Sequence, residues 1–181
     1  MTNSTPAPQT DASRSRPPVG EPTLVALALG RIPSGLFIAT WRDGDQDRGM
    51  LASWVMQAGF EPPMVTMAVA PGRDLLTAVE AGTPFVINVL AENQRSLLAR
   101  FGKPAAAGED PFAGLTVSRA GCGAAALADA AAWLECAAVS RTAGSDAVPG
   151  DHVVVLARVI AAGTGSDQPP LVHLRKNGLR Y

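Results

Sequence analysis

The sequence has few of the residues and motifs that most directly reveal a function. Its 181 residues include only two cysteines, too few for a disulfide framework and typical of a reduced, intracellular protein. The 15 basic and 16 acidic residues form no basic stripe, so we expect no nucleic-acid partner. No apolar run is long enough to cross a bilayer, and no basic amphipathic helix is evident. We therefore expect no membrane association and a cytoplasmic location.

The composition is nevertheless that of a globular protein. Hydrophobic residues make up 47% of the chain and charged residues 17%, which is enough apolar material for a substantial core. Residues 1–22 are rich in Ser, Thr and Pro and lack the apolar run of a signal peptide. The sequence therefore predicts a flexible N-terminal tail over 1–22 and one domain over 23–181.

The common catalytic motifs are also missing. There is no Walker loop, no Gly-x-Ser-x-Gly elbow and no Cys-x-x-Cys pair, and the two histidines and two cysteines are too widely spaced to indicate zinc. Residues 121–126 fit the G-x-G-x-x-A dinucleotide fingerprint, but the 55 residues after them cannot complete a parallel Rossmann sheet. We interpret this stretch as a small-residue loop or turn. Cys136 and His152 could form a nucleophile pair, although a cysteine inside an apolar strand is more often inert.

Short β-forming segments dominate the rest of the chain, and helices are inserted between them. This order indicates a mainly β protein and favours a closed barrel over a βαβ sheet, with an antiparallel meander near the N-terminus. The expected strands cover residues 35–41, 49–57, 64–70, 83–90, 133–140, 152–161 and 171–175, and the expected helices cover 23–32, 74–82 and 92–101.

Residues 49–64 are the most informative segment. They are apolar enough to be buried, yet they contain Ser53, Gln57 and two glycines, which makes them a poor core strand. One interpretation is a barrel strand whose small residues relieve crowding. The other is a wall for a flat flavin ring, to which Met50, Leu51 and Ala52 would offer main-chain groups and Ser53 a hydroxyl.

Four further residues are candidates with two interpretations each. Arg73 follows a Pro-Gly turn just before an expected helix, so it is either a phosphate ligand or a solvated turn residue. Asn88 lies in an apolar strand and needs a partner, which could be main chain or ligand. Phe101 is more often a core residue than a cofactor contact. His152 opens a strand after Gly-Asp, where it is either a turn residue or a contact for a nicotinamide.

Several blocks, taken in order, resemble the flavin reductase-like family. The segments that carry this resemblance are Arg31 to Thr40, Gly49 to Ser53 followed by Pro62 to Val65, Phe85 to Leu90 with Gln94, Leu98 and Phe101, Leu134 to Cys136, and Gly150 to His152. The amino-acid sequence of these segments is most similar to that of flavoredoxin-like proteins and of the C-terminal reductase module of diflavin flavoproteins. The resemblance extends from Leu29 to Tyr181.

The resemblance implies an FMN-binding split β-barrel that forms a homodimer with the flavin near the subunit interface. It implies hydride transfer from NADH or NADPH to FMN, with FAD as a possible replacement, and delivery of electrons to a partner monooxygenase or another redox protein. No acid or base is required, and His152 would help to place the nicotinamide. The cofactor-binding residues implied are Pro33, Ser34, Gly35, Met50, Leu51, Ala52, Ser53, Gln57, Arg73, Asn88, Phe101 and His152.

Two alternatives remain open. The first is an electron carrier of the flavoredoxin type that binds FMN tightly and has little NAD(P)H activity. The second is a non-enzymatic split barrel that binds another ligand or heme. An absorption spectrum distinguishes the second from both flavin proteins.

Overall fold

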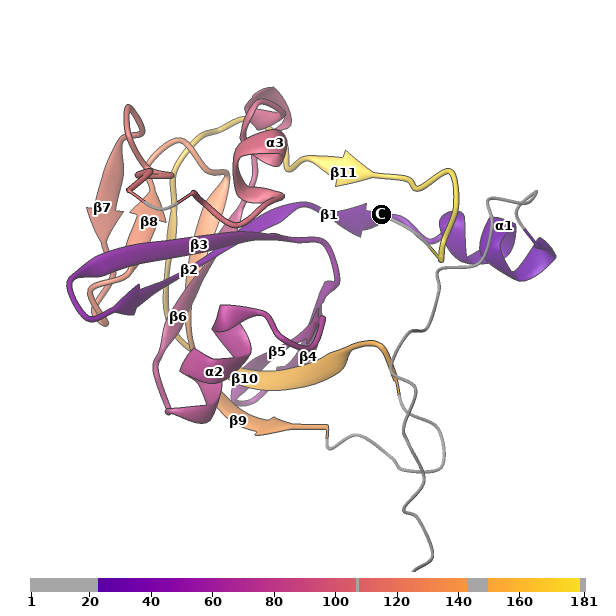
Figure 1. The fold of residues 1–181 in the computed structure, drawn as a ribbon, viewed down its shortest axis with the longest axis horizontal. Coiled ribbons are helices and arrows are strands. Elements are labelled where there is room, and N and C mark those ends of the chain that lie inside the picture. Colours follow the sequence, from indigo (N-terminus) through magenta and orange to yellow (C-terminus); the bar gives the residue numbers. More distant parts are fainter. Residues whose placement is uncertain (1–22, 107, 143–149, 180–181) are drawn as a thin grey trace, which may run out of the picture.

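The computed structural model describes residues 23–106, 108–142 and 150–179, so the tail predicted over 1–22 lies outside the described residues. Strands dominate this part of the chain (Figure 1). The helical elements are α1 (Leu24–Gly30), α2 (Asp74–Glu80), the 3-10 helix η1 (Glu92–Gln94) and α3 (Leu97–Phe101). The strands are β1 (Ser34–Gly35), β2 (Phe37–Asp43), β3 (Gln46–Ala52), β4 (Val55–Phe60), β5 (Pro63–Val69), β6 (Phe85–Val89), β7 (Val117–Arg119), β8 (Ala125–Leu127), β9 (Ala132–Arg141), β10 (Val153–Thr164) and β11 (Val172–His173). None of the described helices is long and apolar enough to cross a bilayer.

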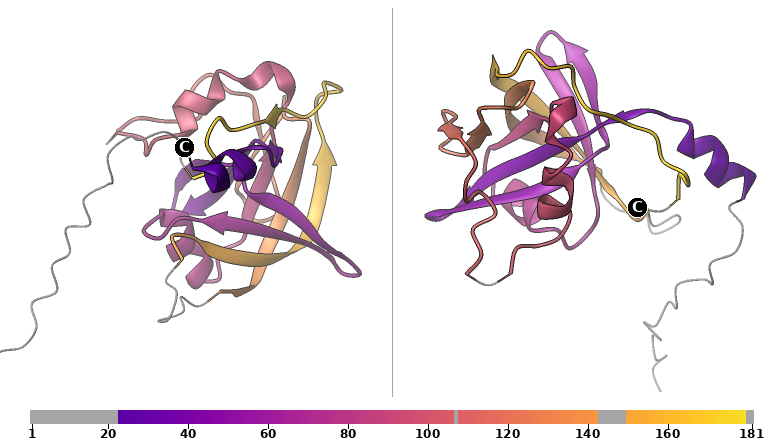
Figure 2. Two further views of the ribbon diagram at one scale, coloured as in Figure 1. Left: turned by 90° about the vertical axis from the view of Figure 1, so that its right-hand side faces the viewer. Right: turned by 90° about the horizontal axis from the view of Figure 1, so that it is seen from above.

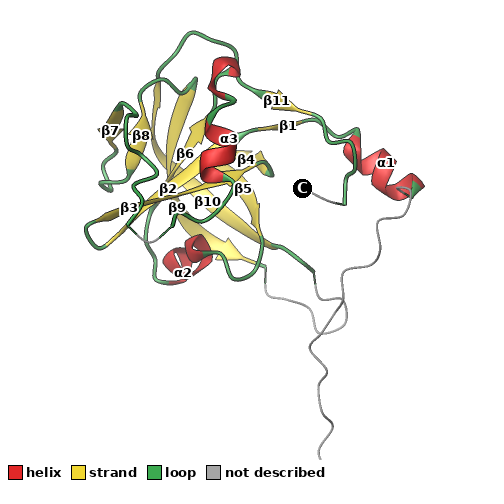
Figure 3. Cartoon of the chain, turned by 45° about the horizontal axis from the view of Figure 1, so that its top comes forward, coloured by secondary structure: helices red, strands yellow, loops and turns green. Residues whose placement is uncertain are grey.

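Seven strands form one curled antiparallel sheet in the order β3-β2-β6-β9-β10-β5-β4. Its two edge strands, β3 and β4, are consecutive in the chain and are joined only by Ser53 and Trp54. A two-residue connection cannot span a flat seven-stranded sheet, so the edges must approach each other. The sheet is therefore a barrel with a split at residues 53–54, and Figures 2 and 3 show its curl from other directions.

The split corrects one expectation from the sequence. We predicted a single strand over 49–57 in an N-terminal meander, whereas the structure has β3 and β4 on opposite edges of the barrel. The reason is strand pairing: β3 pairs with β2 up to Ala52, whereas the chain beyond it pairs with β5, where the main-chain N–H of Ala68 bonds to the carbonyl of Trp54. The helix predicted over 92–101 is likewise two elements, η1 and α3, that are separated by Arg95 and Ser96.

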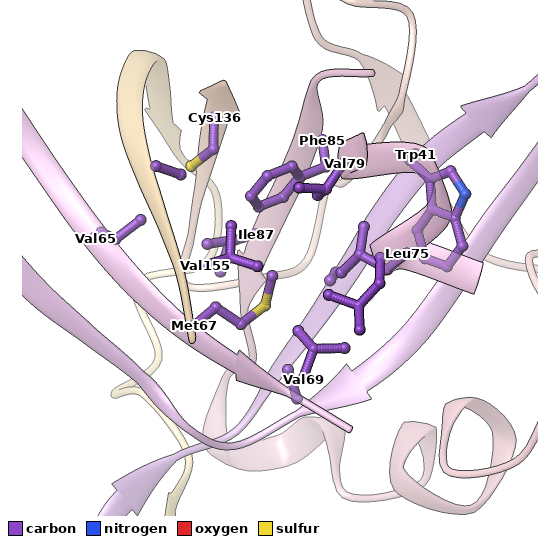
Figure 4. Packing of buried hydrophobic residues seen from close by; sticks show 14 residues of the cluster. Trp41, Val65, Met67, Val69, Leu75, Val79, Phe85, Ile87, Cys136 and Val155 are labelled. Atoms are coloured by element: carbon purple, nitrogen blue, oxygen red, sulfur yellow. The ribbon is translucent and has the colours of Figure 1, made fainter. Parts of the chain in front are cut away.

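The barrel interior is an apolar core that α2 closes at one end. Alternate residues of β5 point inward, as expected for a strand with one buried face, and they meet Leu75, Leu76 and Val79 of α2 (Figure 4). The opposite face of β2 packs in a second cluster, where Ile38 meets Leu97 and Phe101 of α3. These two clusters fix both flanks of the β2–β3 hairpin.

Residues 121–126, which fit the dinucleotide fingerprint, lie in a hairpin. Strands β7 and β8 pair antiparallel, and the turn between them closes with a bond from the Gly123 N–H to the Ala120 carbonyl. Gly123 has φ +81°, a conformation that glycine adopts readily. Within the described part of the chain β8 is followed by strands and not by a helix, so the small-residue turn expected from the sequence is confirmed.

Asp47 joins this hairpin to the β2–β3 hairpin and should make stability depend on pH. Its carboxylate accepts hydrogen bonds from Arg119 (Nη2 to Oδ2, 2.8 Å) and Arg42 (3.1 Å). The Arg119 bond, above all, holds the pKa of Asp47 below its usual 3.8. The contribution of Asp47 to the free energy of unfolding is thus complete above about pH 4 and is lost as the pH falls through the lowered folded pKa.

We expect Asp47→Asn to lower the free energy of unfolding by about 1 kcal/mol at neutral pH and much less at pH 2, as measured by urea titration. A constant difference across this range would contradict the assignment.

Candidate functional site

Two adjoining cavities open at the split in the barrel. The central cavity has a volume of about 490 Å³, and the outer cavity one of about 880 Å³. Both lie in the range of roughly 300–1,000 Å³ that is usual for small-molecule sites. Six residues line both cavities, namely Ser53, Ala68, Ala70, Arg73, His152 and Arg175. The two cavities are therefore parts of one site that share a wall.

The strand β3 provides the apolar wall of the central cavity through Met50, Leu51 and Ala52. Because β3 is an edge strand, the side of its main chain that faces away from β2 is not used in the sheet. Such an edge presents N–H and C=O groups without bulk. The wall can thus contact a flat ring with apolar side chains and bond its polar rim with main-chain groups.

A chain of side-chain contacts crosses the split. Arg175 donates a hydrogen bond to Ser53 Oγ, and its guanidinium carbon lies 4.8 Å from the centre of the Trp54 ring, a cation–π distance. The Trp54 ring centre is 4.5 Å from that of His152, and His152 Nδ1 is 3.0 Å from Asp151 Oδ1. This hydrogen bond lowers the pKa of Asp151. The C-terminal segment and the start of β10 are thereby held against the strand break.

Arg73 enters the site from a turn that its sequence determines. Pro71 and Gly72 occupy the middle of the turn, Gly72 has φ +79°, and the Arg73 N–H bonds to the Ala70 carbonyl. Proline followed by a glycine with positive φ is the signature of a type II turn. The turn follows β5 directly and places Arg73 in the lining of both cavities.

The central cavity suits an anionic ligand. Arg73, Arg175 and Lys176 contribute three positive charges to its lining, which also includes His152 and His173. Among the described residues that line it there is no carboxylate. A ligand with a flat apolar body and a phosphate would satisfy both the β3 wall and this charge.

The structure brings most of the expected site residues together. Met50, Leu51 and Ala52 line the central cavity, and Ser53, Arg73 and His152 line both cavities. The outer cavity also includes Pro33, Ser34 and Gly35. Gln57 is exposed on β4 beyond the lining residues of both cavities. Phe101 is buried against Phe112, with ring centres 5.3 Å apart, and lies outside both cavities.

The Asn88 amide makes hydrogen bonds within the protein through both its nitrogen and its oxygen. Its Nδ2 donates to the carbonyl of Ile38 at 3.0 Å, and its Oδ1 accepts from the N–H of Leu127 at 2.7 Å. The side chain is completely buried and links β6 to β2 and β8. Of the two partners that the sequence left open, main chain or ligand, the structure has the main chain.

Cys136 is also a core residue. It is fully buried in β9, opposite Phe85 of β6, and burial raises the pKa of its thiol to about 12. A thiol with such a pKa carries almost no thiolate at neutral pH, so Cys136 is inert.

Three residues of the central cavity, two of them cations and one a histidine, were absent from the sequence-based site. These are His173, Arg175 and Lys176, on or just after β11. The available signal was the basic cluster that follows a short strand near the end of the chain. This signal could not show that the side chains line the cavity, because among the described strands β11 pairs with β1 alone and its placement depends on that long-range contact.

Comparison with protein families finds a match over residues 29–178 to the flavin reductase like domain. The diflavin flavoprotein A 1 of Synechocystis sp. is 40% identical over 156 residues, which cover 85% of this chain and 26% of that protein. The chain thus spans about a quarter of the length of such curated relatives.

Solved structures agree with this match. The NADH:FAD oxidoreductase SgcE6 of Streptomyces globisporus, in complex with NAD and FAD fragments, has a TM-score of 0.71 at 26% identity and covers 85% of this chain and 87% of that one. Component B of nitrilotriacetate monooxygenase from Mycobacterium thermoresistibile has a TM-score of 0.72 at 24% identity, over 83% and 80% of the two chains. The mainly β split-barrel fold predicted from the sequence is confirmed.

Proposed function

Because the chain belongs to the flavin reductase-like family, we propose that it is an NAD(P)H:flavin oxidoreductase that holds FMN, or FAD in its place, in the central cavity. The observation that supports this most is the combination of an apolar edge-strand wall with three cations and, among the described lining residues, no carboxylate. A flavin has the matching parts, since its ring is flat and apolar with a polar rim and its side chain ends in phosphate.

Each group of residues would do one task. The main chain and side chains of β3 would bind the ring, and Ser53 would offer its hydroxyl to the polar rim while its oxygen accepts from Arg175. Arg73 would hold the phosphate. A bound flavin supplies the electron-accepting ring to which a nicotinamide gives its hydride.

The outer cavity would take the nicotinamide nucleotide. It shares Ser53, Arg73 and His152 with the central cavity, so a ligand there would lie beside the flavin. The His152 side chain is only 13% exposed and is held by Trp54 and Asp151, so it is fixed in direction. Hydride transfer between the two rings requires no side chain to transfer a proton, and correct alignment of the rings alone accelerates it strongly.

The proposal is tested by an anaerobic titration of the purified chain with NADH and with NADPH in the presence of FMN. We expect loss of the visible flavin absorbance at a rate far above that of the nucleotide and FMN without protein. Absence of flavin binding would overturn the proposal.

The same titration separates an electron carrier from a reductase. The carrier is the second candidate because the same sequence segments also resemble flavoredoxin-like proteins, and the 40% identity to a diflavin flavoprotein does not decide between the two. A protein that retains FMN during purification but is not reduced by either nucleotide would be a carrier. In both cases we infer that the electrons pass to an acceptor, such as a partner oxygenase or another redox protein.

We infer further that the protein is a homodimer whose interface lies along the apolar rim of the outer cavity. Apolar side chains that line this cavity remain strongly exposed in one chain, namely Leu29, Ile32, Met56 and Leu179 at 42–64%. Burying such a patch against a second copy would be favourable. Light scattering should give twice the mass of one chain, and Ile32→Asp should give a monomer. Val139→Asp is the control, because Val139 is also exposed, on β9, and lines neither cavity.

A further inference from the structure

The segment that follows Leu171 leaves the barrel and crosses the site. Leu171 itself is 1% exposed and is fixed by two main-chain hydrogen bonds, from its N–H to the Leu90 carbonyl (2.7 Å) and from the Leu36 N–H to its carbonyl (3.1 Å). Residues 172–178, which we call the C-terminal strap, then run beside β1 toward α1 (Figure 1). The strap thus begins at a firm anchor in the barrel and ends on a different element.

The strap forms one wall of the central cavity. His173, Arg175 and Lys176 line this cavity, and Arg175 also lines the outer one. The opposing part of the lining that β3 provides belongs to the barrel. A ligand that fills the central cavity would therefore contact the barrel and the strap together, so its entry and release depend on whether the strap stays in place.

Few buried contacts hold the strap along its length. Its strand β11 has two residues, and among the described strands it pairs with β1 alone. Val172 and Leu174 are 57% and 60% exposed. Segments with a short hydrogen-bonded ladder and little buried apolar surface open locally at a lower free energy than the core. We therefore expect the strap to open while the barrel stays folded.

The far end of the strap is seated on α1 by close main-chain packing. The Gly178 N–H donates to the Ala26 carbonyl at 2.8 Å, and a Cβ at Gly178 would overlap the Cβ of Leu29. A Cβ at Gly30 would lie 2.7 Å from the carbonyl oxygen of Arg175, closer than real Cβ atoms come. Glycine at positions 30 and 178 therefore lets the strap lie directly on the helix.

One side chain holds the strap over the split in the barrel. Arg175 donates a hydrogen bond to Ser53 Oγ, and its guanidinium lies over the Trp54 ring. A hydrogen bond from a charged donor and a cation–π contact are among the stronger side-chain interactions. Ser53 is also the residue that would offer its hydroxyl to the flavin rim. The contact that keeps the strap seated is thus located at the proposed position of the ring.

We propose that the C-terminal strap is a lid, hinged at Leu171 and latched by Arg175, that opens to admit and release the flavin. This inference rests on the proposed function, because it assumes a flavin in the central cavity. If FMN enters and leaves only when the strap is open, its association and dissociation rate constants both scale with the open fraction. A permanent wall behaves differently, since weakening its contacts with a ligand changes mainly the dissociation rate constant.

The test is the variant Gly30→Ala, whose added Cβ pushes against the strap. Gly30 lines neither the central nor the outer cavity, so the substitution touches no proposed flavin contact. Stopped-flow measurements of flavin fluorescence on the purified full chain should show both rate constants for FMN raised about tenfold, equivalent to about 1.4 kcal/mol against the closed strap. The Kd, which is their ratio, should stay within about twofold of the native value.

A control variant and a measurement without any substitution accompany this test. Leu24→Ala should change neither rate constant, because Leu24 belongs to the same helix, is 86% exposed and lines neither cavity. In hydrogen exchange of the native chain without FMN, the strap amides should exchange at least about 100-fold faster than the amides of β6. Saturating FMN should slow the exchange of the strap.

The outcomes separate this inference from the proposed function. A dissociation rate constant that rises alone, or two unchanged rate constants in folded Gly30→Ala, would overturn the lid and leave flavin binding intact. Strap amides that exchange as slowly as those of β6 would also overturn it. A native chain that binds no flavin would overturn the proposed function and this inference together.

Discussion

Replacing Ser53 with tyrosine is expected to abolish flavin binding while the barrel stays folded. Ser53 occupies the break between β3 and β4, is 7% exposed and lines both cavities. A phenol ring at this position would project into the space where the flavin ring is proposed to lie. We expect the Kd for FMN to rise by at least about 100-fold, or roughly 2.7 kcal/mol, as measured by fluorescence titration.

The fold should tolerate this change because the ring would enter a cavity and not the packed core. Ser53 belongs to neither β3 nor β4, so the change falls outside the paired strands. Thermal unfolding followed by circular dichroism should show a transition close to that of the native chain. Ser140→Tyr is a matched control, since Ser140 is an exposed strand residue that lines neither cavity. An FMN affinity that is unchanged in Ser53→Tyr would show that the flavin ring does not bind against the β3 wall.

A smaller change at the same position separates steric blocking from polar contact. Ser53→Ala removes the hydroxyl that accepts from Arg175 and adds no bulk. The hydroxyl is also proposed to bond the polar rim of the flavin, and a hydrogen bond between neutral groups contributes about 0.5–1.5 kcal/mol. Ser53→Ala should therefore raise the Kd for FMN by at most about tenfold, which is less than the effect of tyrosine.

The sequence predicted the positions of most strands because their local signals agree with the final structure. Alternation in β5, β-branched runs in β6 and β10, and Pro-Gly punctuation before α2 all act over a few residues. The same local reasoning located the β3 wall and Arg73. These parts of the site lie on segments whose conformation is determined by their own neighbours.

What the sequence did not predict depends on contacts between distant segments. The break at Ser53 and Trp54 exists because the two halves of one apolar run pair with different partners, β2 and β5. Asn88 is satisfied by groups of Ile38 and Leu127, which are 50 and 39 residues away. Periodicity along one strand contains no information about such partners. The same holds for Arg175, whose partner Ser53 is 122 residues away.

Arg73→Ala should weaken FMN far more than riboflavin. The two ligands share the isoalloxazine ring and the ribityl chain and differ only by the phosphate, so their comparison isolates the group that Arg73 is proposed to hold. Loss of a charge-assisted hydrogen bond costs about 1.5–3 kcal/mol, which corresponds to about 10- to 100-fold in Kd for FMN. Riboflavin should change by less than about twofold.

The salt dependence of FMN binding and a control variant at another arginine test this assignment further. If Arg73 acts on phosphate charge, the native preference for FMN over riboflavin should fall as the salt concentration rises, because screening shortens the reach of exposed charges. Arg158→Ala removes an exposed cation that lines neither the central nor the outer cavity and should leave both affinities unchanged. Equal losses of FMN and riboflavin in Arg73→Ala would show that Arg73 supports the turn after β5 and not the phosphate. The positive charge of the central cavity would then act through Arg175 and Lys176, the two other cations in its lining.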